Sequence, residues 1–304
     1  MHTATLAPHT LQQATVQTPT IPDSVWITGA PLFWKQGYEG NGIKVGVIDS
    51  GIATHPDLTV AYHKDYVQDN LPFHPHGTHV AGTIAANGTL RGVAPKVHLR
   101  DYRVLGASGG GSLDVVAQAI RDAVADGCLI INLSLGAPVD YPPMSEAVNY
   151  AARQGALLCC ASGNAGPNTI SYPAFYDACL SVAAVDVSST GEIQFPSFSS
   201  SNVEVDIAAI GVTVLSCVPG GYAIYSGTSM AAPHVAGLAA LILERIQRRQ
   251  VNASLRMLID DCTVDISAPG VDTATGLGLC TLYPEIPKKV NGAWTLPTMG
   301  VYAP

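Results

Sequence analysis

Short runs rich in apolar residues alternate along this chain of 304 residues with segments whose apolar positions recur every three to four residues. Four of the runs, at 44–48, 97–105, 129–133 and 157–161, have the length of buried strands. Parallel strands that are covered on both faces show such runs, and the helices between them supply the cover. The pattern therefore predicts an α/β fold with a mainly parallel central sheet flanked by helices.

The helices between the runs are marked by capping residues as well as by an apolar stripe. Ser112 suits an N-cap and Gly127 suits the end of a helix. The stripe between them comprises Leu113, Val116, Ala117, Ile120, Ala123 and Val124. Other patterns predict helices from Trp26 to Gly37, from His76, through 145–153 and around 253–260. Further strand-like runs follow at 180–185, 203–209, 213–216 and 222–226.

The most apolar stretch runs from Gly227 to Leu243 and predicts a helix that is buried on almost every side. Ser229 lies in its first turn, where four backbone N–H groups lack partners within the helix and the helix dipole is positive. Such a place stabilises an oxyanion, although a serine there also serves as a simple N-cap. The stretch alone leaves both interpretations open.

Two further segments carry the residues that a reactive serine needs. Asp49 ends an apolar run, and His76 opens the segment HGTHVAGTIAA. A serine hydroxyl is a weak nucleophile, so it needs a general base, and a carboxylate orients that base. Sites of parallel sheets lie beyond the carboxyl ends of the strands, so Asp49, Ser134 and Asn164 are expected at one edge. Asp49, His76 and Ser229 form a candidate catalytic triad.

The motifs IDSGIATHPDL, HGTHVAGTIAA, GVAP, INLSLG, ASGNAGP, SYPAF and GTSMAAPHVAG occur in this order between roughly residues 25 and 245. In these motifs, and in the order Asp, His, Ser, the chain resembles the subtilisin family of serine proteases and, within it, the intracellular subtilisins. The resemblance implies a three-layer subtilisin-like fold and an endopeptidase that forms an acyl-enzyme on Ser229. It also implies that Asn164 donates its side-chain amide to the oxyanion.

The resemblance extends to the residues that bind substrate. Two segments match the strands that hold an extended peptide by β-pairing: Leu105, Gly106, Ser108, Gly109 and Gly110 in one, and Ser134, Leu135 and Gly136 in the other. The walls and base of the primary specificity pocket match Ala161, Ser162, Gly163 and Ser171. Because these residues are small and uncharged, we expect a broad preference for large apolar or uncharged side chains at P1. Tyr172-Pro173 matches a dipeptide that is cis in the family.

The segment 1–20 is rich in Thr, Gln and Pro and lacks hydrophobic periodicity, which predicts an extended arm. A single peptidase domain at 21–283 and a tail at 284–304 are expected to follow. Intracellular subtilisins carry a short extension that lies across the active site as an inhibitor. Its Leu-x-Pro-aromatic motif is matched in part by Leu6 to His9, with His9 in place of the aromatic residue. The arm is therefore expected to be either disordered or inhibitory.

Calcium is the point at which the sequence departs from the family. Asp57 matches a carboxylate ligand of the family's tight calcium site, but the loop that supplies the other ligands is shortened to 87–91 and carries Arg91. Calcium takes about six to eight oxygen ligands, so we expect the tight site to be absent. An alternative, weaker site would use backbone carbonyls near Ala174, Tyr176 and Cys179. No cofactor is needed for the chemistry itself.

Composition narrows the partners and the setting. The net charge of −8 argues against a nucleic-acid surface. No apolar run reaches the roughly 18 residues of a membrane span, and the N-terminus lacks the basic and apolar regions of a secretory signal. We therefore expect a cytoplasmic protein. The seven cysteines are odd in number and several lie in apolar runs, which predicts reduced, buried thiols.

Three functions remain, each with a peptide or protein as partner. An endopeptidase of broad specificity is favoured. The second is a narrow-specificity processing peptidase or transpeptidase that uses the same acyl-enzyme on one dedicated peptide. A non-catalytic binding module is disfavoured, because the three triad residues and Asn164 are all present.

Overall fold

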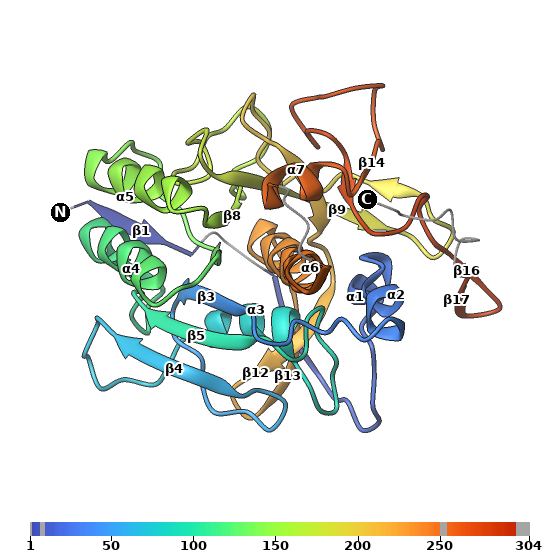
Figure 1. Ribbon diagram of the computed structural model, residues 1–304, viewed down its shortest axis with the longest axis horizontal. Coiled ribbons are helices and arrows are strands. Elements are labelled where there is room, and N and C mark those ends of the chain that lie inside the picture. The colour runs from blue at the N-terminus through green and yellow to red at the C-terminus, as the bar shows by residue number, and fades with distance from the viewer. Residues whose placement is uncertain (1, 7–9, 250–253, 296–304) are drawn as a thin grey trace.

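The computed structural model describes residues 2–6, 10–249 and 254–295 (Figure 1). Its helices are α1 (Asp23–Ile27), α2 (Ala30–Lys35), α3 (Pro75–Ala85), α4 (Leu113–Ala125), α5 (Pro142–Arg153), α6 (Thr228–Arg249) and α7 (Leu255–Asp260). The expected helix that opens at His76 corresponds to α3. The expected helix between Ser112 and Gly127 corresponds to α4, and the Ser112 hydroxyl accepts a hydrogen bond from the Asp114 N–H as its N-cap.

The central sheet lies across the whole molecule. Its strands are β3 (Lys44–Asp49), β4 (Val60–Asp65), β5 (His98–Arg103), β7 (Ile130–Leu133), β8 (Leu157–Ala161), β9 (Leu180–Val187), β10 (Ile193–Gln194), β11 (Ile207–Ile210), β14 (Thr263–Val264) and β15 (Leu279–Cys280). Their order is β14-β15-β11-β9-β8-β7-β3-β5-β4, with β10 added beside β9. All neighbours from β15 to β4 pair in parallel, and β14 and β10 pair antiparallel.

Helices cover both faces of this sheet and confirm the predicted three-layer α/β fold. Alternate residues of β8 point to opposite faces, as in any strand. Leu157 and Cys159 belong to the apolar cluster that includes α3 and α6, whereas Leu158 and Cys160 belong to the cluster that includes α4 and α5. In Figure 1, α4 and α5 lie together at one side of the sheet and α6 crosses its centre on the other.

Helix α6 is the buried helix that the apolar stretch predicts. From Met230 to Leu241, Pro233 is buried and every other side chain except glycine is apolar or neutral with an exposed fraction of 0%. Full burial of one large aliphatic side chain contributes about 1.5 to 3 kcal/mol, so this helix contributes much of the core. It extends beyond Leu243 to Arg249, and the Arg245 guanidinium lies over the Phe33 ring at 5.4 Å.

The structure departs from the sequence predictions at several element boundaries. The single helix expected from Trp26 to Gly37 is two helices, because Gly29 between them has a φ of 79°. A Cβ at Gly29 would lie 2.8 Å from the Leu282 Cβ, so only glycine allows this approach. The run 203–209 forms a strand only from Ile207, and α5 begins at Pro142 instead of at residue 145.

The N-terminal arm forms two strands within the described residues. Strand β1 (Thr3–Thr5) pairs antiparallel with β6 (Gly110–Ser112). Strand β2 (Thr10–Ala14) pairs antiparallel with β13 (Gly221–Ser226), which in turn pairs with β12 (Val214–Val218). Of the partial Leu-x-Pro-aromatic motif, Leu6 is described and residues 7–9 lie outside the described residues.

The tail beyond residue 284 is described as far as Thr295 and folds back onto the domain. Strands β16 (Lys288–Val290) and β17 (Ala293–Thr295) form a hairpin. The Asp23 carboxylate accepts a hydrogen bond from Lys289 Nζ at 2.5 Å and another from Trp294 Nε1 at 2.8 Å. The start of α1 therefore anchors this hairpin.

Candidate active site

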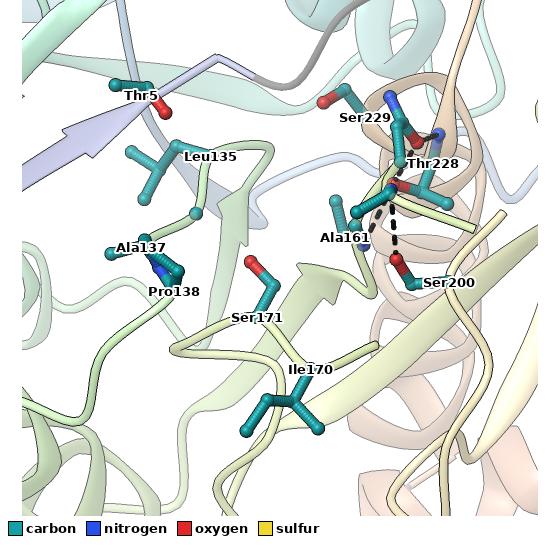
Figure 2. A pocket seen from close by; sticks show the side chains of 14 residues that line it. Thr5, Leu135, Ala137, Pro138, Ala161, Ile170, Ser171, Ser200, Thr228 and Ser229 are labelled. Atoms are coloured by element: carbon teal, nitrogen blue, oxygen red, sulfur yellow. Dashed lines mark hydrogen bonds between the residues drawn. The ribbon is translucent and has the colours of Figure 1, made fainter. Parts of the chain in front are cut away.

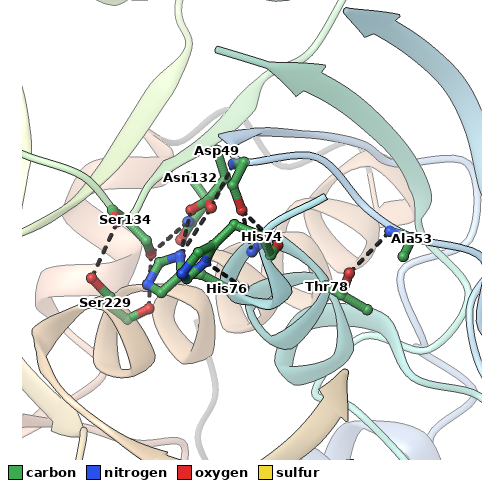
Figure 3. Close-up of polar contacts among 10 residues, drawn as sticks. Asp49, Ala53, His74, His76, Thr78, Asn132, Ser134 and Ser229 are labelled. Carbon is green, nitrogen blue, oxygen red and sulfur yellow. Dashed lines mark hydrogen bonds and ion pairs between the residues drawn. The ribbon is translucent and has the colours of Figure 1, made fainter. Parts of the chain in front are cut away.

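Asp49, His76 and Ser229 come from three different elements and lie together at one edge of the sheet (Figure 3). Asp49 ends β3, His76 is in the first turn of α3, and Ser229 is in the first turn of α6. The His76 Nδ1 lies 2.9 Å from Asp49 Oδ1 and 3.1 Å from Oδ2. Their exposed fractions are 0%, 0% and 1% in chain order. Figure 3 places the His76 ring between the Asp49 carboxylate and the Ser229 side chain.

The turn after Asp49 fixes both the carboxylate and the start of α3. The Ser50 N–H donates to Asp49 Oδ1 at 2.7 Å. The Ser50 hydroxyl donates to the His74 carbonyl at 2.9 Å and accepts from the Gly77 N–H at 3.0 Å. A Cβ at Gly77 would lie 2.5 Å from the Gly51 carbonyl oxygen. Glycine is therefore required where the helix meets the turn.

Ser229 is tied to the end of β7. Its hydroxyl donates to the Ser134 carbonyl at 3.1 Å, and the Ser134 hydroxyl donates back to the Ser229 carbonyl at 2.8 Å. The Asn132 amide donates to the Ser134 hydroxyl at 2.9 Å. Sequence reasoning placed Ser134 at this edge but missed Asn132, because its position inside an apolar run indicated only a strand.

Asn164 is oriented by the residue that precedes Ser229. Its Oδ1 accepts hydrogen bonds from the Thr228 N–H at 2.9 Å and from the Thr228 hydroxyl at 2.8 Å. The acceptor end of the amide is thus held by Thr228, and the donor end is turned away from it. Asn164 and Ser229 both line the cavity described next. Sequence reasoning missed the part that Thr228 plays in this orientation.

A cavity of about 240 Å³ adjoins Ser229 (Figure 2). It is lined by Thr5, Leu135, Gly136, Ala137, Pro138, Ala161, Gly163, Asn164, Ala165, Ile170, Ser171, Ser200, Thr228 and Ser229. None of these described lining residues carries a charge. Three of the four expected pocket residues are among them, whereas Ser162 is buried and donates its hydroxyl to the Ser200 carbonyl at 3.1 Å. The Tyr172-Pro173 bond next to Ser171 is cis, as the resemblance implies.

Strand β1 of the arm lies between the two segments that were expected to hold a peptide. The Thr5 N–H donates to the Gly136 carbonyl at 2.9 Å, and the Gly136 N–H donates to the Thr5 carbonyl at 3.0 Å. On the other side, the Leu6 N–H donates to the Gly109 carbonyl at 3.0 Å. Ala4 is fully buried in the cluster that includes Leu105 and Leu135. Gly106 and Ser108 form the turn before β6, with the Gly109 N–H donating to the Gly106 carbonyl at 2.9 Å.

The Asp57 carboxylate is surrounded by hydrogen-bond donors from the protein. Oδ1 accepts from the Thr89 N–H at 2.9 Å, and Oδ2 accepts from the Leu90 N–H at 2.7 Å and from the Tyr222 hydroxyl at 3.0 Å. Arg91 does not contact Asp57: its guanidinium pairs with Glu39 and lies over the Trp34 ring at 4.3 Å. The shortened loop presents N–H groups to Asp57, whereas calcium requires oxygen ligands. These residues do not fit the family's tight calcium site.

The carbonyls expected to form a weaker calcium site have other partners. The Cys179 carbonyl accepts a hydrogen bond from the Arg256 guanidinium at 2.8 Å, and the Tyr176 carbonyl accepts one from the Cys179 N–H at 2.8 Å. A guanidinium cation at Cys179 competes with calcium for that oxygen. The weaker site near Ala174 stays a prediction.

Within the described residues, one group of side chains brings together donor atoms of the kind that bind metal ions: His55, Asp57 and Cys217. The His55 Nδ1 already accepts from the Asp57 N–H at 3.1 Å, and its Nε2 donates to the Gly221 carbonyl at 3.0 Å. Burial and the nearby Asp57 raise the pKa of the Cys217 thiol, which opposes the thiolate that a metal needs. We therefore interpret this group as a structural hydrogen-bond cluster. All seven cysteines are buried free thiols, which confirms the prediction.

Comparison with known proteins agrees with the motifs. A family model described as the subtilase family matches residues 40–280. M-protease of Shouchella clausii (strain KSM-K16) is 41% identical over 281 residues, which is 89% of this chain and 69% of that protein. Subtilisin Savinase of Lederbergia lenta is 42% identical over 274 residues, covering 87% and 95%. Subtilisin DY of Bacillus licheniformis is 42% identical over 239 residues, covering 74% and 85%.

These relatives bear on the expected setting. They establish the family, but they do not support an intracellular location. The resemblance to the intracellular subtilisins and the cytoplasmic location therefore stay predictions. Of the helices in the described part of the chain, none has both the length and the apolar character needed to cross a bilayer.

Proposed function

The chain belongs to the subtilase family of serine endopeptidases, and we propose that it hydrolyses peptide bonds through an acyl-enzyme on Ser229. The observation that carries the proposal is the buried Asp49–His76 pair beside Ser229 at the start of α6. The Ser229 oxygen attacks the carbonyl carbon while His76 takes the hydroxyl proton. His76 then gives this proton to the leaving amine. Water then attacks the acyl carbon while His76 takes its proton, and His76 returns this proton to the Ser229 oxygen as the acid leaves.

Asp49 and Asn164 complete the mechanism. The Asp49 carboxylate accepts a hydrogen bond from His76 Nδ1–H, stays ionised, and stabilises the imidazolium that forms at His76. The oxyanion is bound by the Ser229 N–H, which lies where helix N–H groups lack intrahelical partners, and by the Asn164 amide. The orientation of Asn164 by Thr228 supports this role, because an amide held in advance needs no reorganisation during the reaction.

We propose that the cavity beside Ser229 binds the P1 side chain and prefers large uncharged residues. Its volume of about 240 Å³ suits a large side chain, and its described lining carries no charge. The Ser171 hydroxyl lies in this lining, and Ile170 at its rim is 43% exposed. Burial of an ionised P1 side chain among such groups is costly, so Lys, Arg, Asp and Glu are disfavoured.

The test is the mass spectrometry of casein fragments produced by protein that lacks residues 1–9. Broad specificity predicts many cleavage sites, with Leu, Met, Phe or Tyr before most of them. The narrow-specificity alternative predicts one or a few sites that share a longer sequence. Cleavage mainly after charged residues would contradict the assignment of the cavity. A Ser229→Ala variant provides the control for contaminating proteases.

We further propose that the arm inhibits the enzyme by occupying the substrate position. Strand β1 and the Leu6 that follows it use the main-chain groups of Gly136 and Gly109 that an extended substrate would use, and Thr5 lines the P1 cavity. Strand β2 occupies the edge of β13, which leads directly to Gly227 and Ser229. A substrate must therefore displace the arm.

Two substitutions at one position test this inhibition. Thr5→Pro removes the N–H that donates to Gly136, whereas Thr5→Ala keeps both backbone hydrogen bonds. Backbone hydrogen bonds contribute about 0.5 to 1.5 kcal/mol each, and loss of this pairing should raise kcat/KM on a peptide substrate by about tenfold. Thr5→Ala should leave it near the wild-type value. Equal kcat/KM for wild type, Thr5→Pro and the protein without residues 1–9 would contradict inhibition by the arm.

A further inference from the structure

A second histidine–carboxylate pair lies behind the catalytic turn. His63 is on β4 and Asp101 is on the neighbouring β5, and the His63 Nδ1 lies 2.7 Å from Asp101 Oδ2. The Asp101 side chain is 0% exposed, whereas that of His63 is 41% exposed. The pair thus joins a fully buried carboxylate to a ring that exchanges protons with solvent.

Asp101 is bonded directly to the turn that carries Asp49. Its Oδ2 also accepts a hydrogen bond from the Ile52 N–H at 2.9 Å, and Ile52 lies three residues after Asp49. Asp101 pairs with Val47 in the register of β3 and β5, two residues before Asp49. Burial raises the pKa of the Asp101 carboxyl above its ordinary value, and the negative charge of Asp49 makes a smaller contribution in the same direction.

His63 contacts the segment that leads into the catalytic histidine. Its ring packs against Phe73, with ring centroids 5.6 Å apart. Phe73 precedes His74, whose Nδ1 accepts from the His76 N–H at the start of α3. A Cβ at Gly51 would lie 3.1 Å from the Phe73 ring. The pair therefore supports both sides of the Asp49–His76 contact.

The other charged side chains around the His63–Asp101 pair form ion pairs with other residues. Arg103 lies over Phe73 at 4.8 Å and donates to Asp65 at 2.9 Å and to Asp69 at 2.7 Å. Lys64 pairs with Asp122 at 2.6 Å. The group in direct contact with Asp101 that can carry a positive charge is thus the His63 ring, when it is protonated. The hydrogen bond to Asp101 raises the pKa of His63 above its ordinary value, with smaller contributions from Asp101 and Asp65 charges opposed by burial and Arg103.

We propose that His63 and Asp101 are positioning residues for the catalytic turn, and that the proton on His63 keeps Asp101 from adding a second uncompensated negative charge beside Asp49. The protonated pair is neutral overall. When His63 loses its proton, a buried carboxylate without a cation remains near the triad. That charge favours the imidazolium of His76 and so opposes its action as a base. This proposal rests on the triad assigned above.

The test is the pH profile of kcat/KM on a short peptide substrate, measured on protein without residues 1–9. His63→Gln leaves the pair with a net charge of −1, so the acid limb of the profile should move to higher pH. We expect a shift of about half a pH unit, less than the roughly one to three units that a contacting charge produces. The double variant His63→Gln/Asp101→Asn is neutral again and should return the limb to the wild-type position.

His98→Gln is the matched control, because it removes an exposed histidine from the start of β5 and should leave the profile unchanged. His63→Asn repeats the experiment if the glutamine variant does not fold. An unshifted acid limb in an active His63 variant, or a shift that the double variant does not reverse, would overturn the proposal and leave the triad intact. Failure of the triad itself would show instead as full activity in Ser229→Ala.

Discussion

Replacement of Asp57 by alanine should destabilise the protein strongly, and calcium should not restore the loss. The Asp57 carboxylate accepts hydrogen bonds from two backbone N–H groups of the 87–91 loop and from the Tyr222 hydroxyl. Asp57 is only 4% exposed. Alanine leaves the two N–H groups without this acceptor. Each buried group left unsatisfied costs about 1 to 3 kcal/mol, so the free energy of unfolding should fall by about 2 to 6 kcal/mol. That is a large part of the roughly 5 to 15 kcal/mol of a typical domain.

The assay is urea unfolding, measured in a Ser229→Ala background to prevent self-digestion, with either excess calcium or a chelator. Because N–H groups of the loop occupy the Asp57 carboxylate, the unfolding midpoint of the parent should be the same in both conditions. Glu146→Ala is the matched control, since Glu146 is 75% exposed and 3.8 Å from Arg121, a pair whose loss should have little effect. A stabilisation of the parent by calcium that Asp57→Ala abolishes would refute the reasoning, because it would locate a calcium ion at this site.

Three further predictions concern the active site and its histidines. Asn164→Ala should lower kcat on the order of 100- to 1000-fold with a small change in KM, which is the effect of removing the oxyanion-hole asparagine in subtilisin. An unchanged kcat would show that Asn164 does not take part in the mechanism. Gly77→Ala should lower kcat/KM by about tenfold or more, because the added Cβ would lie 2.5 Å from the Gly51 carbonyl oxygen and displace His76 from Asp49. Steady-state kinetics and a crystal structure of the variant would check this. Burial lowers the pKa of His79 to about 3 and that of His234 to about 4 in the folded protein. In the unfolded protein both have the ordinary pKa of about 6.5, so as the pH falls below this value the unfolded state takes up protons that the folded state does not. Stability should therefore decline by about 2 to 3 kcal/mol for each of the two by pH 4.5, and urea unfolding of His79→Gln in the inactive background should show a shallower decline than the parent.

Local patterns were sufficient for the elements whose formation depends on nearby residues. The stripe between Ser112 and Gly127 predicted α4 because capping and periodicity are both local. The uniform apolar character after Gly227 predicted a helix buried on all sides for the same reason. The edge at which Asp49 and Asn164 lie followed from the geometry of parallel sheets.

Contacts between distant residues were not predictable in this way. The break at Gly29 depends on Leu282, more than two hundred residues later. The strand β1 forms through main-chain pairing with β6 and through bonds to Gly136, and such bonds leave no side-chain pattern in a Thr-rich segment. The pairing of His63 with Asp101 joins two strands whose sequences indicated only a sheet.

The surroundings of Asp57 could be predicted only in part from the loop sequence. Its length indicated that ligands are missing around Asp57. The partners that replace them, the N–H groups of Thr89 and Leu90, depend on the loop's backbone conformation. Arg91 was expected near the place of the cation, but it turns instead to Glu39 and the ring of Trp34.

The central claim is that Asp49 and His76 make the hydroxyl of Ser229 reactive. The most direct measurement is the rate at which a fluorophosphonate labels protein without residues 1–9, with the modified residue identified by mass spectrometry. We predict a single label on Ser229, formed much more slowly in His76→Ala and Asp49→Asn and not at all in Ser229→Ala. Equal labelling rates in the parent and in His76→Ala, or a label on another residue, would contradict the account.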